Sequence, residues 1–184
     1  FSIIRAAKEK IATHKNRIDI ILVLNQDTIN LHKDKLNENS VIIYDPEFTK
    51  IEGLTFKVRT LELPIEKIVK EENASEIIRN TCILGAFIKA VGIKWEILDK
   101  IFREEFIREI DLNLKVARRG YDAIDELMKI DLIAQEPLPL VTGNQAVSLG
   151  LIKGGLSTYI SYPMTPTSPI LHFLAEIGDD FCLK

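Results

Sequence analysis

The sequence contains few of the residues from which proteins build metal centres and disulfide frameworks. Its 184 residues include two cysteines, Cys82 and Cys182, and three histidines, His14, His32 and His172. None of these residues stands at the close spacing of zinc or iron–sulfur ligands, so the chain by itself predicts no metal site. So few cysteines fit a reducing compartment, and we expect a cytoplasmic location.

Long apolar runs and an excess of positive charge are missing as well. No apolar run approaches the roughly 18 uncharged residues that a membrane span needs. The first ten residues carry four charged side chains instead of the apolar core of a signal peptide. The formal net charge of −3 gives no general attraction for nucleic acid. We therefore expect neither a membrane nor a nucleic acid as a partner, and the hydrophobic content of 46% is typical of a globular chain.

Familiar catalytic and phosphate-binding motifs are absent too. The sequence has no P-loop, no Gly-x-Gly-x-x-Gly turn and no Ser–His–Asp series. The adjacent carboxylates of Glu104–Glu105 and of Asp179–Asp180 point in different directions on a helix or a turn, which argues against a paired acid and base. Because no glycine-rich phosphate loop is present, a free-standing nucleotide-binding protein of the Rossmann type is disfavoured.

Strand-like and helical segments alternate in the first part of the chain. Three segments have the composition of strands, namely Ile18–Leu24, Val41–Tyr44 and Phe56–Leu63. Asp27 or Thr28 caps a short helix through Leu36 after the first of them, and Pro64 opens another after the third. This alternation predicts an α/β fold with a Rossmann-like, open, mostly parallel sheet and flanking helices.

Three longer helices follow, which we predict over Ser75–Val91, Trp95–Ile107 and Leu112–Met128, the last capped by Asp111. Gly85 lies inside the first of them, where glycine costs about 1 kcal/mol relative to alanine. We therefore expect another backbone to pack closely against it, and we expect Gly92 to end this helix.

The last part of the chain contains three prolines in a short polar loop. A helix is predicted over Asn144–Lys153, then a β-type run over Thr158–Tyr162, and then the loop. Ser168 and Pro169 have the pattern of an N-cap and a first helical residue. A stiff loop at a helix start can present Thr165, Thr167 and Ser168 to a ligand. The alternative is an ordinary loop whose hydroxyls only cap the helix.

Residues 143–176, GNQAVSLGLIKGGLSTYISYPMTPTSPILHFLAE, resemble the start of the alpha domain of 2-oxoacid:ferredoxin (acceptor) oxidoreductases. In that family a Gly-Asn-x-Ala helix leads to a Tyr-Pro-x-Thr-Pro-x-Ser turn. Upstream, the segments that begin at Ile18 and Val41 resemble the gamma domain of the same enzymes. The glycine-rich first turn of that domain is absent here, so no ligand role is carried over from it.

The resemblance implies a fused gamma–alpha chain. Residues 1–130 would form a gamma-type α/β domain with an incomplete N-terminal part, residues 131–142 a linker, and residues 143–184 the first helix, strand and helix of the alpha domain. We accordingly expect a piece of a longer polypeptide that is inactive alone.

The resemblance also implies a reaction and its cofactors. These enzymes decarboxylate a 2-oxoacid oxidatively with coenzyme A, giving an acyl-CoA, CO2 and reduced ferredoxin. Thiamine diphosphate with magnesium would be held at the interface with a beta subunit, and iron–sulfur clusters would lie in partner subunits. Four residues would line the thiamine site: Tyr162, Pro163, Met164 and Thr165. Thr165 would be catalytic, near the thiazolium ring and the substrate carboxylate.

Two interpretations stay open at this point. Lys115, Arg118 and Arg119 share one helix face and could contact ferredoxin or the phosphates of coenzyme A, although a solvated face is the simpler interpretation. The chain could also be a non-catalytic module for subunit assembly, in which the proline loop only caps a helix.

Overall fold

The computed structural model describes residues 2–9, 11–130, 139–162 and 164–181. Contacts within the chain divide it into two compact units, Phe1–Ile133 and Ala134–Lys184, which are considered separately. None of the helices in the described ranges is long and apolar enough to cross a membrane.

The first unit contains a three-stranded parallel sheet. Its strands are β1 (Ile20–Val23), β2 (Val41–Tyr44) and β3 (Arg59–Glu62), in the order β1-β2-β3. Each strand pairs over four residues, so Ile20 lies beside Val41 and Val41 beside Arg59. The predicted α/β fold with an open parallel sheet is confirmed. The third strand is shorter than predicted because β2 offers only four residues for pairing.

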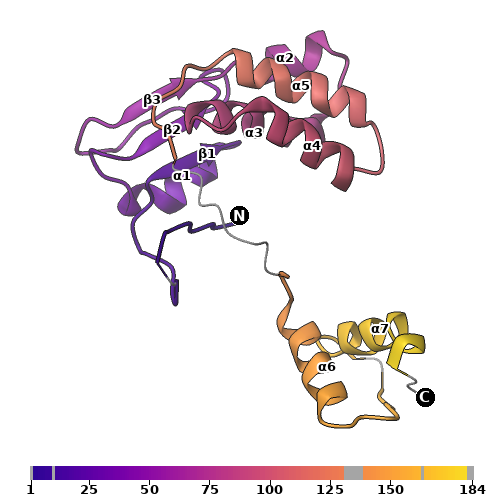
Figure 1. The fold of residues 1–184 in the computed structure, drawn as a ribbon. Helices are drawn as coiled ribbons and strands as arrows, with labels where there is room; N and C mark the ends of the chain where they lie inside the picture. Colours follow the sequence, from indigo (N-terminus) through magenta and orange to yellow (C-terminus); the bar gives the residue numbers. More distant parts are fainter. Residues whose placement is uncertain (1, 10, 131–138, 163, 182–184) are drawn as a thin grey trace. The chain divides into compact units, whose positions relative to one another are not determined.

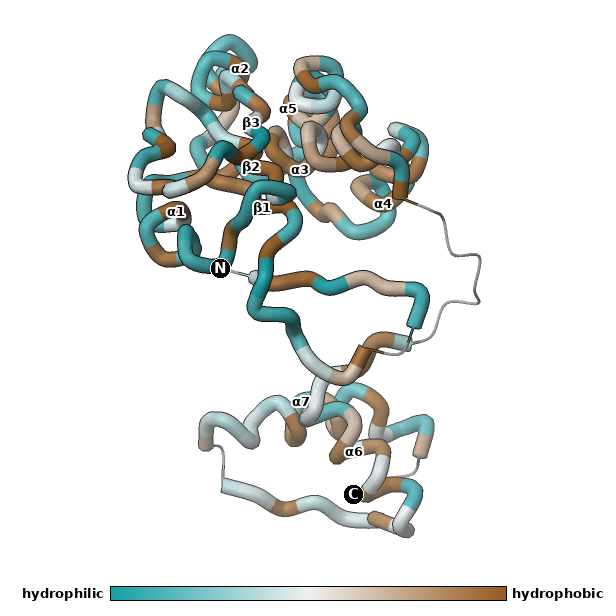
Figure 2. Tube along the Cα trace, turned by 90° about the vertical axis from the view of Figure 1, so that its left-hand side faces the viewer, coloured by the Kyte–Doolittle hydropathy of each residue, from teal (hydrophilic) through white to brown (hydrophobic). Residues whose placement is uncertain are grey.

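The two faces of the sheet pack against different helices because side chains alternate along each strand. On one face, Val41 and Ile43 join a buried cluster with residues of α2 (Ile65–Glu71), α3 (Arg79–Ala90) and α5 (Ile110–Asp122). On the other face, Ile42 and Tyr44 pack with Ile29 of α1 (Gln26–His32). Figure 1 shows α1 on one side of the sheet and the other helices on the opposite side. In Figure 2 the chain at β1 and β2 is mainly brown, the colour of hydrophobic residues.

Helices α3 and α5 pack tightly against each other, and two glycines make this possible. A Cβ atom added to Gly85 would lie 1.9 Å from the carbonyl oxygen of Ala117. A Cβ atom added to Gly120 would lie 2.1 Å from the carbonyl oxygen of Cys82. Each glycine thus faces the backbone of the other helix, and the predicted close packing at Gly85 is confirmed.

Helix α4 (Trp95–Glu105) completes this unit on the side of α5. Leu98 and Phe102 are buried against Leu114 and Ala117 of α5. Phe102 also stacks on Phe106, just past the helix end, with 4.5 Å between ring centroids.

The predicted cap of α1 is wrong. Asn25, directly after β1, is the N-cap, and its Oδ1 accepts a hydrogen bond from the Thr28 amide at 3.0 Å. Asp27 lies in the first turn instead. The helix ends at His32 and tightens into a short 3-10 turn over Lys33–Lys35, so it is shorter than predicted.

The predicted limits of the helix near residue 120 are also wrong. Helix α5 begins at Ile110 after Glu109, whose φ is 50°, and Asp111 lies inside the first turn. The helix ends at Asp122, not at Met128. Beyond it, the amides of Leu127 and Met128 donate to the carbonyl oxygen of Ala90, at 2.9 and 3.1 Å. The chain leaves the helix because these amides satisfy the open carbonyl at the end of α3. That helix itself ends as predicted, before Gly92 with φ 70°.

The second unit consists of α6 (Gly143–Lys153), α7 (Ser168–Glu176) and a short 3-10 turn over Asp179–Phe181. The two helices contact each other. The predicted strand over Thr158–Tyr162 is wrong, because this segment has no regular secondary structure and Ile160 is 91% exposed. A strand needs a neighbour for its backbone groups, and the described residues of this unit contain no strand to pair with it.

Candidate functional site

The proline loop of the second unit is closed by one carbonyl group. The carbonyl oxygen of Met164 accepts from the amides of Thr167 and Ser168, at 2.8 and 3.1 Å. It also accepts from the hydroxyl of Thr167 at 2.8 Å. The Thr165–Pro166 peptide bond between these groups is cis. Three donors therefore hold the turn that carries Thr165.

The start of α7 differs from the prediction. Thr167 occupies the N-cap position without a side-chain capping bond, and Ser168 and Pro169 are the first two helical residues. The helix starts one residue early because the Ile170 amide already reaches the carbonyl oxygen of Thr167, at 2.9 Å. The predicted capping by Ser168 is therefore wrong, and the hydroxyl of Thr165 does not cap the helix either.

Helix α6 holds the loop from the other side. Asn144, in its first turn, donates from Nδ2 to the carbonyl oxygen of Pro166 at 3.1 Å. The helix start is itself closed by a capping box between Thr142 and Gln145. The pattern Thr-x-x-Gln is a known signature of this arrangement and was available in the sequence. Both helices of the second unit thus fix the loop.

The loop directs its remaining side chains outward. Tyr162 is 82% exposed and Met164 is 60% exposed. Thr165 is exposed, and its hydroxyl has no hydrogen-bond partner among the described residues. The predicted Pro163 lies outside the described residues. A phenol, a thioether and an uncommitted alcohol within one short segment can supply a hydrogen-bond donor beside an apolar wall.

The loop does not supply the groups that a metal–diphosphate complex needs. Within the described ranges, no group of three or more His, Cys, Asp or Glu side chains could hold a metal ion. Binding of thiamine diphosphate near this loop stays a prediction.

The basic triplet of α5 is paired within the first unit. Lys115 Nζ lies 2.5 Å from Glu72 Oε2, and Arg119 Nη1 lies 3.0 Å from Glu72 Oε1. Arg119 also pairs with Glu71. The hydrogen bond from Lys115, more than that from Arg119, lowers the pKa of Glu72 below 4.5. These residues tie the end of α2 to α5.

The third member of the triplet is also engaged. Arg118 Nε lies 2.9 Å from Asp122 Oδ2, and its guanidinium lies 5.1 Å from the ring centroid of Trp95 and 5.3 Å from that of Tyr121. The simple interpretation as a solvated face is therefore incomplete, since each cation has an internal partner. Contact with ferredoxin or coenzyme A stays a prediction.

Buried carboxylates at the carboxyl ends of the strands were not singled out in the sequence. Asp45, directly after β2, accepts from the amides of Glu47 and Glu66, at 2.9 and 3.0 Å. Glu66 is buried and pairs with Arg79, whose guanidinium lies 5.4 Å from the ring centroid of Phe48. The sequence feature that could have indicated this cluster is Asp45 followed by Pro46, directly after a strand. All these contacts are internal, so the cluster braces the loops of this sheet edge.

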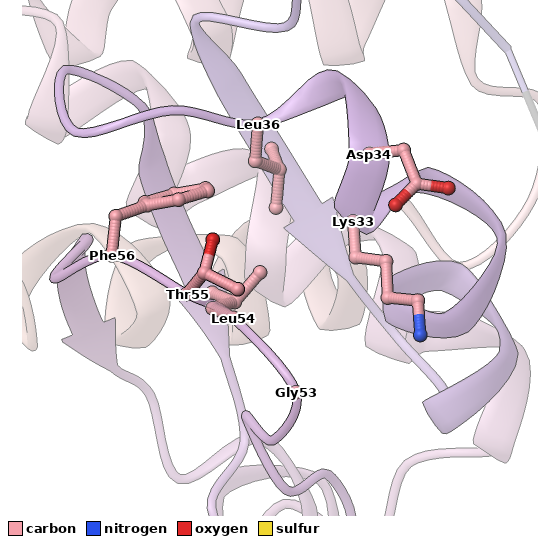
Figure 3. Close-up of a pocket in the computed structure, with 7 residues that line it drawn as sticks. All are labelled: Lys33, Asp34, Leu36, Gly53, Leu54, Thr55 and Phe56. Carbon is pink, nitrogen blue, oxygen red and sulfur yellow. The ribbon is translucent and has the colours of Figure 1, made fainter.

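A small open pocket of about 270 Å³ lies in the first unit. Figure 3 shows its lining, which combines apolar side chains with the Lys33 ammonium and the Asp34 carboxylate. Its walls, around Leu36 and residues 53–56, precede β2 and β3 in the chain. In open α/β sheets, ligands bind at the opposite edge, where the strands end. The pocket therefore supports no functional assignment.

The chain is similar in sequence to one family of known proteins. The model of the family described as pyruvate ferredoxin/flavodoxin oxidoreductase matches residues 1–123. The chain is 27% identical over 128 residues to "2-oxoacid:ferredoxin oxidoreductase 2, subunit alpha" of Aeropyrum pernix, and this match covers 60% of the chain and 20% of that protein.

Two solved structures share the fold. The 2-oxoglutarate:ferredoxin oxidoreductase from Magnetococcus marinus, solved with 2-oxoglutarate, coenzyme A and succinyl-CoA bound, matches with a TM-score of 0.75 and 23% identity. That match covers 97% of this chain and 33% of the other. The gamma subunit of a keto/oxoacid ferredoxin oxidoreductase from Geobacter sulfurreducens matches with a TM-score of 0.51 and 22% identity, over 57% of this chain and 63% of the other.

The match thus spans one fifth of the curated relative and one third of the first solved chain. The family model, however, covers more than half of this chain. The motifs around Ile18, Val41 and Thr165 had predicted the same family from the sequence. The chain belongs to the pyruvate ferredoxin/flavodoxin oxidoreductase family.

Proposed function

We propose that this chain is the gamma-type domain and the start of the alpha domain of a thiamine-diphosphate-dependent 2-oxoacid:ferredoxin oxidoreductase. The complete enzyme would decarboxylate a 2-oxoacid oxidatively with coenzyme A and give an acyl-CoA, CO2 and reduced ferredoxin. Family membership supports this reaction class. The observation that carries the site is the exposed Thr165 hydroxyl, which has no partner among the described residues although its loop is fixed from two helices.

In this proposal the residues of the loop bind and orient the substrate. The thiamine cofactor, when bound, supplies the electron sink for decarboxylation. The Thr165 hydroxyl donates a hydrogen bond to the 2-oxoacid carboxylate and fixes its direction. Tyr162 and Met164 form a wall that keeps water from the reacting group.

The remaining parts of the enzyme would come from other chains. A beta subunit would hold the diphosphate and magnesium, since in the described ranges of this chain no group of three or more His, Cys, Asp or Glu side chains could hold a metal ion. Partner subunits would carry the iron–sulfur clusters that pass electrons to ferredoxin. The assembly would be cytoplasmic, and this chain alone would be inactive.

The test uses the full-length chain purified with its partner subunit. The assay is coenzyme-A-dependent reduction of ferredoxin with a panel of 2-oxoacids. We expect Thr165→Val to lower kcat/KM for the 2-oxoacid about 10- to 100-fold, the loss expected for one hydrogen bond to a charged group. The matched control is Thr158→Val, which removes the hydroxyl of another exposed threonine before the loop.

Equal activity of the Thr165→Val and Thr158→Val enzymes would contradict the role of Thr165. A complex that oxidises no 2-oxoacid would favour the alternative, a non-catalytic assembly module. One observation favours that alternative. At the sheet edge where α/β folds bind ligands, the buried carboxylates of Asp45 and Glu66 already have internal partners. Asp45 accepts from the Glu66 amide, and the Glu66 carboxylate pairs with the half-buried Arg79.

A further inference from the structure

Asn144 reaches from α6 to the loop that carries Thr165. Its side-chain amide donates to the carbonyl oxygen of Pro166, 22 residues further along the chain, at 3.1 Å. Its own backbone carbonyl accepts from the buried Ser148 hydroxyl at 2.8 Å. Asn144 is therefore held at its backbone and extends a single donor toward the loop.

The helix does not need this side chain for its own start. The capping box already closes the first turn, with the Gln145 amide donating to Thr142 Oγ1 at 3.2 Å. In return, the Thr142 amide donates to Gln145 Oε1 at 2.8 Å. Asparagine is a poor residue inside a helix. The hydrogen bond from Asn144 to Pro166 therefore stabilises the loop and not the start of the helix.

The hydrogen bond from Asn144 lies directly next to Thr165 in the chain. Thr165 lies between Met164, whose carbonyl accepts three hydrogen bonds, and Pro166, whose carbonyl accepts the bond from Asn144. The backbone on both sides of Thr165 is therefore held. Its own hydroxyl takes no part in these bonds and is left for a ligand.

We propose that Asn144 is a positioning residue, which fixes the backbone after Thr165 so that the Thr165 hydroxyl meets the substrate carboxylate. This inference rests on the proposed function. Holding a group in its productive direction before the substrate binds raises the rate without any contact between Asn144 and the substrate.

The first experiment compares two isosteric changes in the same helical turn. Asn144→Asp removes the amide donor to Pro166, and Gln145→Glu keeps the acceptor of the capping box. Each adds one negative charge near the start of α6, where such charge is favourable for the helix. In the full-length chain with its partner subunit, we expect Asn144→Asp to lower kcat/KM for the 2-oxoacid about tenfold. Gln145→Glu should change it less than about twofold, and KM for coenzyme A should stay the same in both.

A double-mutant cycle with Thr165→Val tests whether Asn144 acts through Thr165. We expect the combined enzyme to be no slower than Thr165→Val alone. The inference would be overturned if the combined enzyme lost kcat/KM by the product of the two single losses. It would also be overturned if Gln145→Glu lowered kcat/KM as much as Asn144→Asp does. Should Asn144→Asp fail to copurify with the partner, Asn144→Ala replaces it in the same cycle without added charge.

The outcomes separate the two proposals. If the wild-type complex oxidises no 2-oxoacid, the proposed function fails and this inference fails with it. If Thr165→Val lowers activity and Asn144→Asp does not, only the positioning role fails.

Discussion

The two units of this chain use their polar groups in opposite ways. In the first unit, charged side chains are matched internally, as in the pairs of Glu66 with Arg79 and of Glu72 with Lys115. Every ion pair found among the described residues lies in this unit. In the second unit, hydrogen bonds hold the loop backbone while Tyr162, Met164 and Thr165 face outward.

This difference distinguishes polar groups that serve folding from polar groups that are free to bind a ligand. A side chain whose bonding capacity is used internally contributes to folding, whereas one held in place with its capacity unused can bind a ligand. On this criterion the ion pairs of the first unit contribute to its folding, and the proline loop is the candidate site. If the contacts within the first unit serve folding, changes at Gly85, Cys82 and Glu72 should alter its stability or the protection of its buried groups.

The largest effect is expected at the crossing of α3 and α5. Gly85→Ala would place a methyl group against the Ala117 carbonyl, where an ideal Cβ lies at 1.9 Å, and the backbones must separate. We expect the free energy of unfolding to fall by about 3 kcal/mol, measured by chemical denaturation. The control is Gly150→Ala in α6, where nothing lies within 4 Å of the added atom. That change should stabilise its helix by up to about 1 kcal/mol. A Gly85→Ala protein as stable as the wild type would disprove the tight crossing.

The next effect concerns the thiol beside this crossing. Burial raises the pKa of the Cys82 thiol from 9.0 to about 12. In a Cys182→Ser background, we expect Cys82 to react with a thiol reagent at about pH 8 roughly 1,000-fold more slowly than in denaturant, from the smaller thiolate fraction alone. Because the folded pKa is raised, the stability from burying the thiol is complete below pH 9.0 and is lost between 9.0 and about 12. Rapid labelling of the folded chain would show that the thiol is accessible.

The smallest effect is expected at the pairs between α2 and α5. The lowered pKa of Glu72 means that its stabilising contribution is present above pH 4.5 and is lost as the pH falls through the folded value. Glu72→Gln should lower the denaturation midpoint slightly at about pH 7, and this difference from the wild type should shrink as the pH falls through the lowered pKa of Glu72. Glu104→Gln, which removes an exposed pair with Lys100 at 3.7 Å, is the control. If the denaturation midpoint of Glu72→Gln changed with pH in the same way as that of the wild type, the pairs of Glu72 with Lys115 and Arg119 would not stabilise the fold.

Much of the fold followed from local sequence pattern. The apolar runs at Ile18–Leu24 and Val41–Tyr44 predicted strands of a parallel sheet because both faces of such strands are buried, and β1 and β2 lie within these runs. Gly85 predicted a close helix crossing, because glycine destabilises a helix interior and close packing of another backbone offsets this cost. The proline loop was predicted as a candidate site from its prolines and from a family motif, and in the structure the Thr165 hydroxyl has no hydrogen-bond partner among the described residues.

Other features could not be predicted from local pattern. The segment Thr158–Tyr162 has the composition of a strand, but β-structure depends on a neighbour that composition does not specify. Helix α5 ends at Asp122 because the amides beyond it bond to Ala90, at the end of a different helix. Asn144 contacts Pro166 across 22 residues, and spacing alone gave no sign of it.

The sequence by itself therefore determined the α/β class, the parallel strands, the glycine crossing and the family, because each depends on residues close together in the chain or on a contiguous motif. Only the tertiary structure decided which charges neutralise one another, where helices end, and that Thr165 is held between two bonded carbonyls with its hydroxyl unused. Those outcomes depend on which distant groups meet in space, since a hydrogen-bonding group committed to one partner is withdrawn from every other.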